Sequence, residues 1–138
     1  MNIDINTCTV QEACDYAVQQ MVKQGKPCFL PHSDGACAYA DGHGNHCAIG
    51  WLLNHNNKEL MSAGDAISEL VHDGINGIPQ IIHKNLSIFE KLQQFHDSAS
   101  LRRLTPEMAK ANLEQQGIDT SAPHWDEWMD IANEAKNS

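Results

Sequence analysis

An apolar stripe between positions 9 and 24 places the strongest constraint on how this chain can fold. Its members recur at intervals of three and four residues, the period of an α-helix that turns one face to a core. Thr9 and Glu12 have the spacing of a capping box at the helix start, and Gly25 is a typical stop at its end. Cys14 lies within the stripe, so its thiol is expected to pack as a small core residue. The stripe consists of Val10, Ala13, Cys14, Ala17, Val18, Met21 and Val22.

Caps and apolar spacing predict four more helices further along the chain. These helices are expected at about residues 62–74, from residue 87 onward, at 105–117 and after Pro123. The segment 74–86 is expected to be a loop with a buried anchor at Ile81 and Ile82, because it contains two glycines and a proline. The helix starts are marked by Ser62 with Asp65, by Ser87 with Glu90, by Thr105 with Pro106, and by Pro123.

Residues 37–53, C-A-Y-A-D-G-H-G-N-H-C-A-I-G-W-L-L, are the chemically densest part of the sequence. A short strand is expected at its start, followed at 41–45 by a turn of residues that tolerate positive φ. The apolar run from Cys47 onward fits either a returning strand or a buried helix, because it is apolar on every side. We expect a β-hairpin that passes into a short helix. The predicted fold class is therefore α+β and mostly helical, with about five helices around a small β-hairpin in one layer-packed domain of residues 1–138.

The length and charge of the chain limit its number of domains and its classes of binding partner. A chain of 138 residues suits one domain, and its formal net charge is −9, from 18 acidic and 9 basic residues. An acidic surface repels phosphate backbones, so direct binding of nucleic acid is not expected. The surface is expected to be solvated, with attraction to a basic partner protein as the alternative.

The sequence predicts a cytoplasmic protein that does not enter a membrane. It contains no apolar run of about 18 residues, and its N-terminus lacks the basic and apolar regions of a signal peptide. Cysteines in the cytoplasm are normally reduced thiols, and an odd number of them argues against a closed disulfide framework. The five cysteines are Cys8, Cys14, Cys28, Cys37 and Cys47.

Zinc is one interpretation of the dense stretch. Cys37, His43, His46 and Cys47 are all legitimate zinc ligands. Structural zinc sites prefer pairs of ligands two to four residues apart, which suits His43 with His46 but not the distant cysteines. His46 and Cys47 are adjacent, and adjacent side chains of a strand point to opposite faces.

Three other interpretations of this stretch remain open. Cys37 and Cys47 would lie opposite each other in a hairpin and could form a disulfide. Cys47 could be a nucleophile with His46 or His43 as its base and Asp41 as the orienting group. The favoured interpretation is structural: a close-packed hairpin whose cysteines pack, whose glycines permit the turn, and whose two histidines face water at the tip.

Two further groups are candidate functional residues. His96 and Asp97 lie near the end of a predicted helix, where the carboxylate could orient the imidazole for acid–base chemistry. No partner nucleophile is visible, and a hydrogen-bonded histidine that serves the structure is the favoured interpretation. Trp125 and Trp128 share one helix face, so they are expected in the core, with a protein-binding patch as the alternative.

Two segments together resemble a group of small uncharacterised proteins of bacteria and their phages. The first is the dense stretch, with Cys-x-Tyr, a glycine turn and Cys-Ala-Ile-Gly, and the second is Leu92-Gln93-Gln94-Phe95-His96-Asp97. The final helix with Trp125 also matches in position. No activity can be carried over from this group, and the resemblance implies an accessory gene of a phage or mobile element.

The sequence therefore predicts a small acidic cytoplasmic binding protein, encoded by a phage or mobile element, that acts by protein–protein interaction. Inhibition of a host defence system is one form that this function would take, and a homo-oligomer is a further possible assembly. Enzymatic activity is not favoured, and no cofactor is expected. The alternative is a zinc-binding protein or small enzyme that uses the Cys/His-rich hairpin at 37–47.

Overall fold

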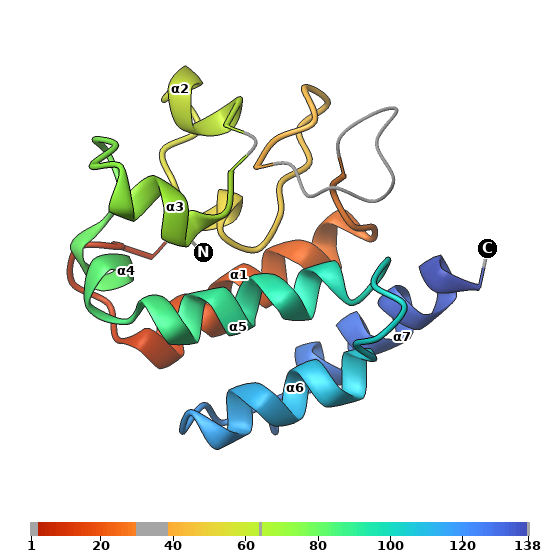
Figure 1. The fold of residues 1–138 in the computed structure, drawn as a ribbon. Helices are drawn as coiled ribbons and strands as arrows, with labels where there is room; N and C mark the ends of the chain where they lie inside the picture. The colour runs from red at the N-terminus through yellow and green to blue at the C-terminus, as the bar shows by residue number, and fades with distance from the viewer. Residues whose placement is uncertain (1–2, 30–38, 64, 138) are drawn as a thin grey trace.

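Helices are the only regular secondary structure elements among the described residues. The computed structural model describes residues 3–29, 39–63 and 65–137. Figure 1 shows the arrangement of the elements within these ranges. In chain order they are α1 (Val10–Gln24), the 3-10 helix η1 (Gly50–Leu52), α2 (Lys58–Met61), α3 (Ile67–His72), α4 (Gln80–Lys84), α5 (Leu86–Asp97), α6 (Pro106–Gln115) and α7 (Pro123–Lys136).

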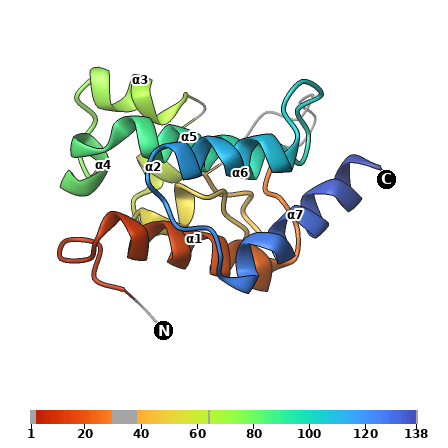
Figure 2. The same ribbon diagram turned by 90° about the horizontal axis from the view of Figure 1, so that it is seen from below.

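The four long helices form a closed ring of neighbours. α1 packs on α5 and α7, and α6 packs on the same two helices (Figure 2). Shorter elements cover the outside of this bundle, with η1 against α1 and with α3 and α4 against α5. The centre is filled by large side chains that have no solvent exposure, because each long helix turns an apolar face inward. The largest of them are Trp125, Trp128, Phe89, Phe95 and Met21.

The first helix forms as the sequence predicts. The Thr9 side chain accepts a hydrogen bond from the Glu12 N–H at 3.1 Å, and Glu12 accepts one from the Thr9 N–H at 2.9 Å. Gly25 has φ 79° and donates its N–H to the carbonyl of Met21. Both ends are fixed locally, so the stripe of apolar residues is presented to the core at a defined register.

The last two helices are also confirmed. α6 has Thr105 as N-cap, which accepts from the Met108 N–H, and Pro106 occupies its first turn. α7 begins at Pro123. Proline is favoured at these positions because the N–H that it lacks would have no partner within the helix.

The predicted caps of the middle helices are wrong. α5 begins at Leu86 without a side-chain cap, so Ser87 and Glu90 do not form a capping box. Ser62 follows the end of α2, and α3 begins at Ile67 without a side-chain cap. The segment expected to be a loop contains α4. The short helices α3 and α4, which have no side-chain cap, are stabilised by burial of their apolar residues. Ile82 of α4, for example, is fully buried.

The predicted β-hairpin is also wrong, and the fold class is α rather than α+β. The described residues contain no β-strand, and most of the expected first strand lies outside them. The expected second strand instead forms a helical turn, in which the Trp51 N–H of η1 bonds the Cys47 carbonyl at 3.1 Å. Glutamine side chains, rather than a second strand, bond the backbone of this segment.

None of the helices in the described ranges has the length and apolar character needed to cross a membrane.

Candidate functional site

The Cys-Ala-Ile-Gly segment is fastened to the end of α1 by Gln24. Its Nε2 donates to the His46 carbonyl at 3.0 Å, while its Oε1 accepts from the His46 N–H at 2.8 Å and from the Trp51 indole N–H at 3.1 Å. A neighbouring strand would bond the same backbone groups of His46. Gln24 therefore replaces the strand partner that the hairpin prediction requires.

The turn at 41–45 is organised by one carboxylate. Asp41 accepts hydrogen bonds from the N–H groups of His43 and Asn45 and from the Asn45 side chain. Burial raises the pKa of Asp41, but the hydrogen bonds from Asn45 and His43 outweigh it and hold the pKa below its usual value. Gly42 and Gly44 have φ of 81° and 86°, as the turn prediction expects.

His96 and Asp97 are brought together as a structural pair. His96 is fully buried, and its Nε2 accepts the backbone N–H of Cys28 at 2.9 Å. A backbone N–H can only donate, so the ring proton is on Nδ1, which lies 2.9 Å from Asp97 Oδ1. Neither ring nitrogen is left to take a proton from a substrate. The imidazole also stacks on Trp128 at 5.7 Å between ring centroids.

Gln93 connects the two segments that carry the sequence resemblance. Its Nε2 donates to Asp97 Oδ1 at 2.9 Å, and its Oε1 accepts the Ile49 N–H at 3.2 Å. Through Gln93 and His96, α5 holds both the Cys-Ala-Ile-Gly segment and the segment around Cys28. The two resembling motifs are thus parts of one hydrogen-bonded unit.

Three of the described cysteines, Cys14, Cys28 and Cys47, are buried. Burial, reinforced by nearby Cys47, raises the pKa of the Cys28 thiol to about 12. Burial similarly raises the pKa of Cys14 to about 12. Such thiols stay protonated at neutral pH and are poor nucleophiles. Cys47 has no solvent exposure, and its Sγ accepts the Gly50 N–H at 3.4 Å.

The four candidate zinc ligands are not seen together. Cys37 lies outside the described residues, which also leaves its predicted disulfide with Cys47 outside them. His43 is exposed at the turn, whereas His46 is 7% exposed and its Nδ1 lies 2.8 Å from the Tyr39 carbonyl. His46 therefore does not face water as the favoured hairpin interpretation expects. Among residues 3–29, 39–63 and 65–137, no three His, Cys, Asp or Glu side chains are grouped to hold a metal ion.

Both candidate tryptophans of α7 lie in the core. Trp125 and Trp128 have no solvent exposure. The Trp125 indole N–H bonds Asp15 at 2.9 Å, and that of Trp128 bonds the Phe95 carbonyl at 3.1 Å. Their position agrees with packing and offers no exposed indole to a partner.

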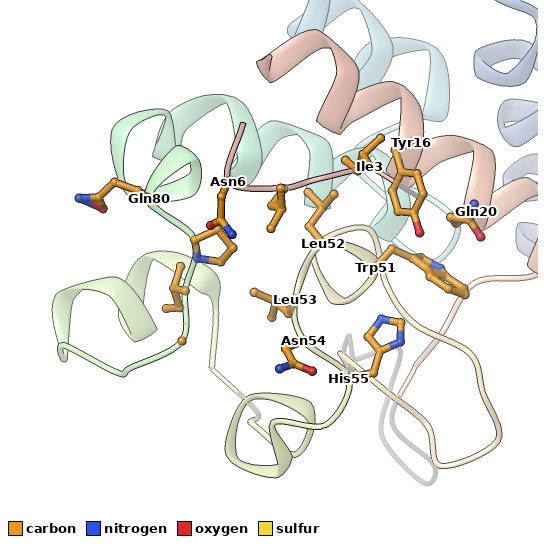
Figure 3. Close-up of a pocket in the computed structure, with 14 residues that line it drawn as sticks. Ile3, Asn6, Tyr16, Gln20, Trp51, Leu52, Leu53, Asn54, His55 and Gln80 are labelled. Atoms are coloured by element: carbon orange, nitrogen blue, oxygen red, sulfur yellow. The ribbon is translucent and has the colours of Figure 1, made fainter. Parts of the chain in front are cut away.

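An open groove lies beside η1, away from these buried groups. Its volume is about 1040 Å³, and Figure 3 shows the side chains that line it. They come from the N-terminal segment (Ile3, Ile5 and Asn6), from α1, from residues 51–55 and from residues 77–80. Four stretches far apart in sequence therefore meet at one surface.

The two ends of the groove differ. Tyr16 and Gln20 of α1 lie near Trp51 and His55 at one end, and Asn6 and Gln80 lie toward the other (Figure 3).

The His55 ring stacks on His46 at 3.8 Å between centroids and donates from Nε2 to the Gly50 carbonyl at 3.0 Å. Burial, with the charge of nearby His55, lowers the pKa of His46 below its usual value. The Trp51 ring meets both imidazoles edge-on, so the aromatic end of the groove is held in place from behind.

The sequence did not indicate the groove or the clamping role of Gln24 and Gln93. Glutamine has no local signature for such a role, because the backbone groups that it bonds belong to distant segments. A partial signal for the groove existed in Trp51, an indole that follows a glycine instead of lying in an amphipathic stripe.

No known protein-family model, curated protein or solved structure matches this chain.

Proposed function

We propose that this chain is a small acidic binding protein that acts by holding part of a partner protein in the groove beside η1. The groove is the observation that carries the proposal. Its volume of about 1040 Å³ is at the upper end of the usual range for ligand sites, and it is open to solvent along one surface. Grooves with an apolar floor and a polar rim are common places for protein recognition.

The distribution of free polar groups supports binding over catalysis. In the candidate acid–base pair, His96 bonds the Cys28 N–H and Asp97. The Asp97 carboxylate also accepts from Gln93. At the groove, by contrast, the side chains of Gln20 and Gln80 make no hydrogen bond to any other described residue. The free donors and acceptors therefore lie where a partner can reach them.

The sequence resemblance gives the proposal its context. We place the protein in the cytoplasm of a bacterium that carries a phage or mobile element, with a host protein as its partner. A component of a host defence system is the class of target that this context favours. A net charge of −9 is consistent with a soluble partner protein rather than nucleic acid.

Partner capture from lysates of candidate bacterial hosts tests the proposal. We compare the wild-type chain with Gln20→Lys and Gln80→Lys, which add a charge at the two ends of the groove. Gln19→Lys is the matched control, because Gln19 is the exposed neighbour of Gln20 on α1 and does not line the groove. Capture of the same host protein by wild type and control, with a loss of about ten-fold in the groove variants, is expected.

Two results contradict the proposal. One is capture of no partner across several lysates, and the other is capture that the groove variants leave unchanged. Metal analysis of the same protein, purified without a histidine tag, addresses the zinc alternative. Stoichiometric zinc that is lost in Cys47→Ala would favour the metalloprotein over the binding protein.

A further inference from the structure

A second pocket lies at the end of α7, away from the groove beside η1. Its volume is about 420 Å³, which is within the usual range for small-molecule sites. The described lining residues come from the segment 27–29 after α1, from residues 99–102 between α5 and α6, and from the end of α7. The pocket and the groove have no described lining residue in common, so the two sites are separate.

The segments that form this pocket differ in charge from the rest of the chain. The chain has 18 acidic and 9 basic residues, yet residues 25–29, 98–105 and 135–137 contain no Asp or Glu. The basic residues of these segments are Lys26, Arg102, Arg103 and Lys136. Two of them, Arg102 and Lys136, line the pocket. An otherwise acidic chain therefore has a locally basic surface here, which attracts an anion.

Both lining cations have hydrogen-bond donors that the described chain does not use. The Arg102 side chain makes no hydrogen bond to another described residue. Lys136 donates one ammonium hydrogen to the Leu104 carbonyl at 2.9 Å, which holds the ammonium group in place and leaves two hydrogens. Neither cation forms an ion pair with a described carboxylate. An anionic ligand supplies the partner that both cations lack among the described residues.

Most of the remaining lining is apolar. The Phe29 ring lies against the buried His96 ring at 5.4 Å between centroids, so this wall is supported from behind. An apolar group that packs on these side chains is removed from water, which favours binding. The apolar lining residues are Pro27, Phe29, Ala99 and Ala135.

The end of α7 limits the charge of the ligand. Ala135 and Lys136 belong to the last turn of this helix, where the unpaired carbonyl groups carry partial negative charge. This charge opposes a doubly charged phosphate more than a singly charged carboxylate. None of the described lining residues lies at the start of a helix, where backbone amides favour phosphate. A planar carboxylate also matches the paired N–H donors of an arginine.

We propose that this pocket binds a small monocarboxylate whose acid group is attached to an apolar body. The carboxylate accepts hydrogen bonds from Arg102 and Lys136, and the apolar body packs on Phe29 and the lining alanines. This site goes beyond the proposed function and does not depend on it, because it shares no described lining residue with the groove.

Titration with hydrocinnamate, followed by NMR, tests the proposal. The amide signals of Phe29, Ala99 and Ala135 are expected to shift, whereas those of Gly77 and Ile78 at the groove are not. Hydrocinnamide has nearly the same shape without the charge, and it should bind about ten-fold more weakly. Phenyl phosphate, which is mostly doubly charged at neutral pH, should also bind more weakly than hydrocinnamate.

Two arginine variants separate this site from a general effect of surface charge. Arg102→Gln should weaken hydrocinnamate binding about ten-fold. It should fold as the wild type does, because Arg102 is exposed. Arg103→Gln is the matched control and should change binding less than about two-fold, because Arg103 is the exposed neighbour and does not line the pocket.

Four results overturn the proposal. They are no shift of the pocket amides at millimolar hydrocinnamate, equal binding of hydrocinnamide, equal losses in Arg102→Gln and Arg103→Gln, and tighter binding of phenyl phosphate. None of them bears on the capture of a host protein by the groove, which is measured separately.

Discussion

At the scale of single residues, Gly50 has the closest backbone neighbour of the described glycines. A Cβ added there would collide with the carbonyl oxygen of Tyr39, which is backbone and cannot rotate away. Gly117 gives a contrast, because its φ is 88° but no atom lies within 4 Å of an added Cβ. Two glycines of this chain are therefore required for different physical reasons, close approach in one case and backbone conformation in the other.

Gly50→Ala is expected to lower the free energy of unfolding by about 3 kcal/mol or to prevent folding, because backbone must move. Gly117→Ala should cost only about 1–2 kcal/mol, the price of a left-handed alanine. Urea denaturation followed by circular dichroism measures both. Equal losses in the two variants would show that the contact with Tyr39 is relieved without cost.

At the scale of elements, α5 acts as the anchor for the irregular region between α1 and α2. Gln93 and His96 lie three residues apart on one helix face, which lets them reach two different segments of this region. Both bonds are made to backbone N–H groups, whose burial without a partner is costly. The irregular region thus gains its order from a neighbouring helix instead of from a sheet.

Replacing the adjacent residues Gln93 and Gln94 in turn separates the stability that the anchoring hydrogen bond contributes from the effect of alanine on helix propensity. Gln93→Ala removes the acceptor of the buried Ile49 N–H and should lower the free energy of unfolding by about 1–3 kcal/mol. Gln94→Ala is the matched control and should change it by less than about 0.5 kcal/mol, because the Gln94 side chain makes no hydrogen bond to another described residue. Thermal and urea unfolding of both variants give the comparison, and a similar loss in each would contradict the anchoring.

At the scale of the whole molecule, burial of His46 makes the free energy of unfolding depend on pH. The pKa of His46 is lowered in the folded state by burial and by His55, so the unfolded chain binds a proton more readily. The stabilisation is therefore complete above the ordinary histidine pKa of about 6.5 and is lost as the pH falls through the folded value.

The free energy of unfolding is expected to fall between about pH 7 and 5, with a slope from His46 of at most about 1.4 kcal/mol per pH unit. His46→Gln should flatten this slope, whatever its effect on absolute stability. Urea titrations at several pH values measure this slope. An equal slope in wild type and His46→Gln would contradict the assignment of the pH dependence to His46.

The absence of charged side chains among the described residues that line the groove predicts how binding depends on salt. Although the chain carries a net charge of −9, none of the described lining residues is charged. Partner affinity through the groove should therefore change less than about three-fold between low and high salt, because screening acts on charged contacts. Binding measured by calorimetry across salt concentrations tests this, and a steep loss with salt would place the interface on the acidic surface.

The sequence alone determined the helices whose signals are local. α1, α6 and α7 were predictable because caps, prolines and apolar periodicity lie within each helix. The burial of Trp125 and Trp128 followed from the same periodicity. These features depend on residues a few positions apart, which is the range that sequence patterns describe.

The tertiary structure decided the rest, including the loss of the expected hairpin and the existence of the groove. The run from Cys47 is apolar on every side, so its backbone takes the conformation that distant partners satisfy, and these are Gln24 and Gln93. His96 and Asp97, a candidate acid–base pair in the sequence, are part of that scaffold. The groove arises only where four separate stretches meet, and no local pattern records such a meeting.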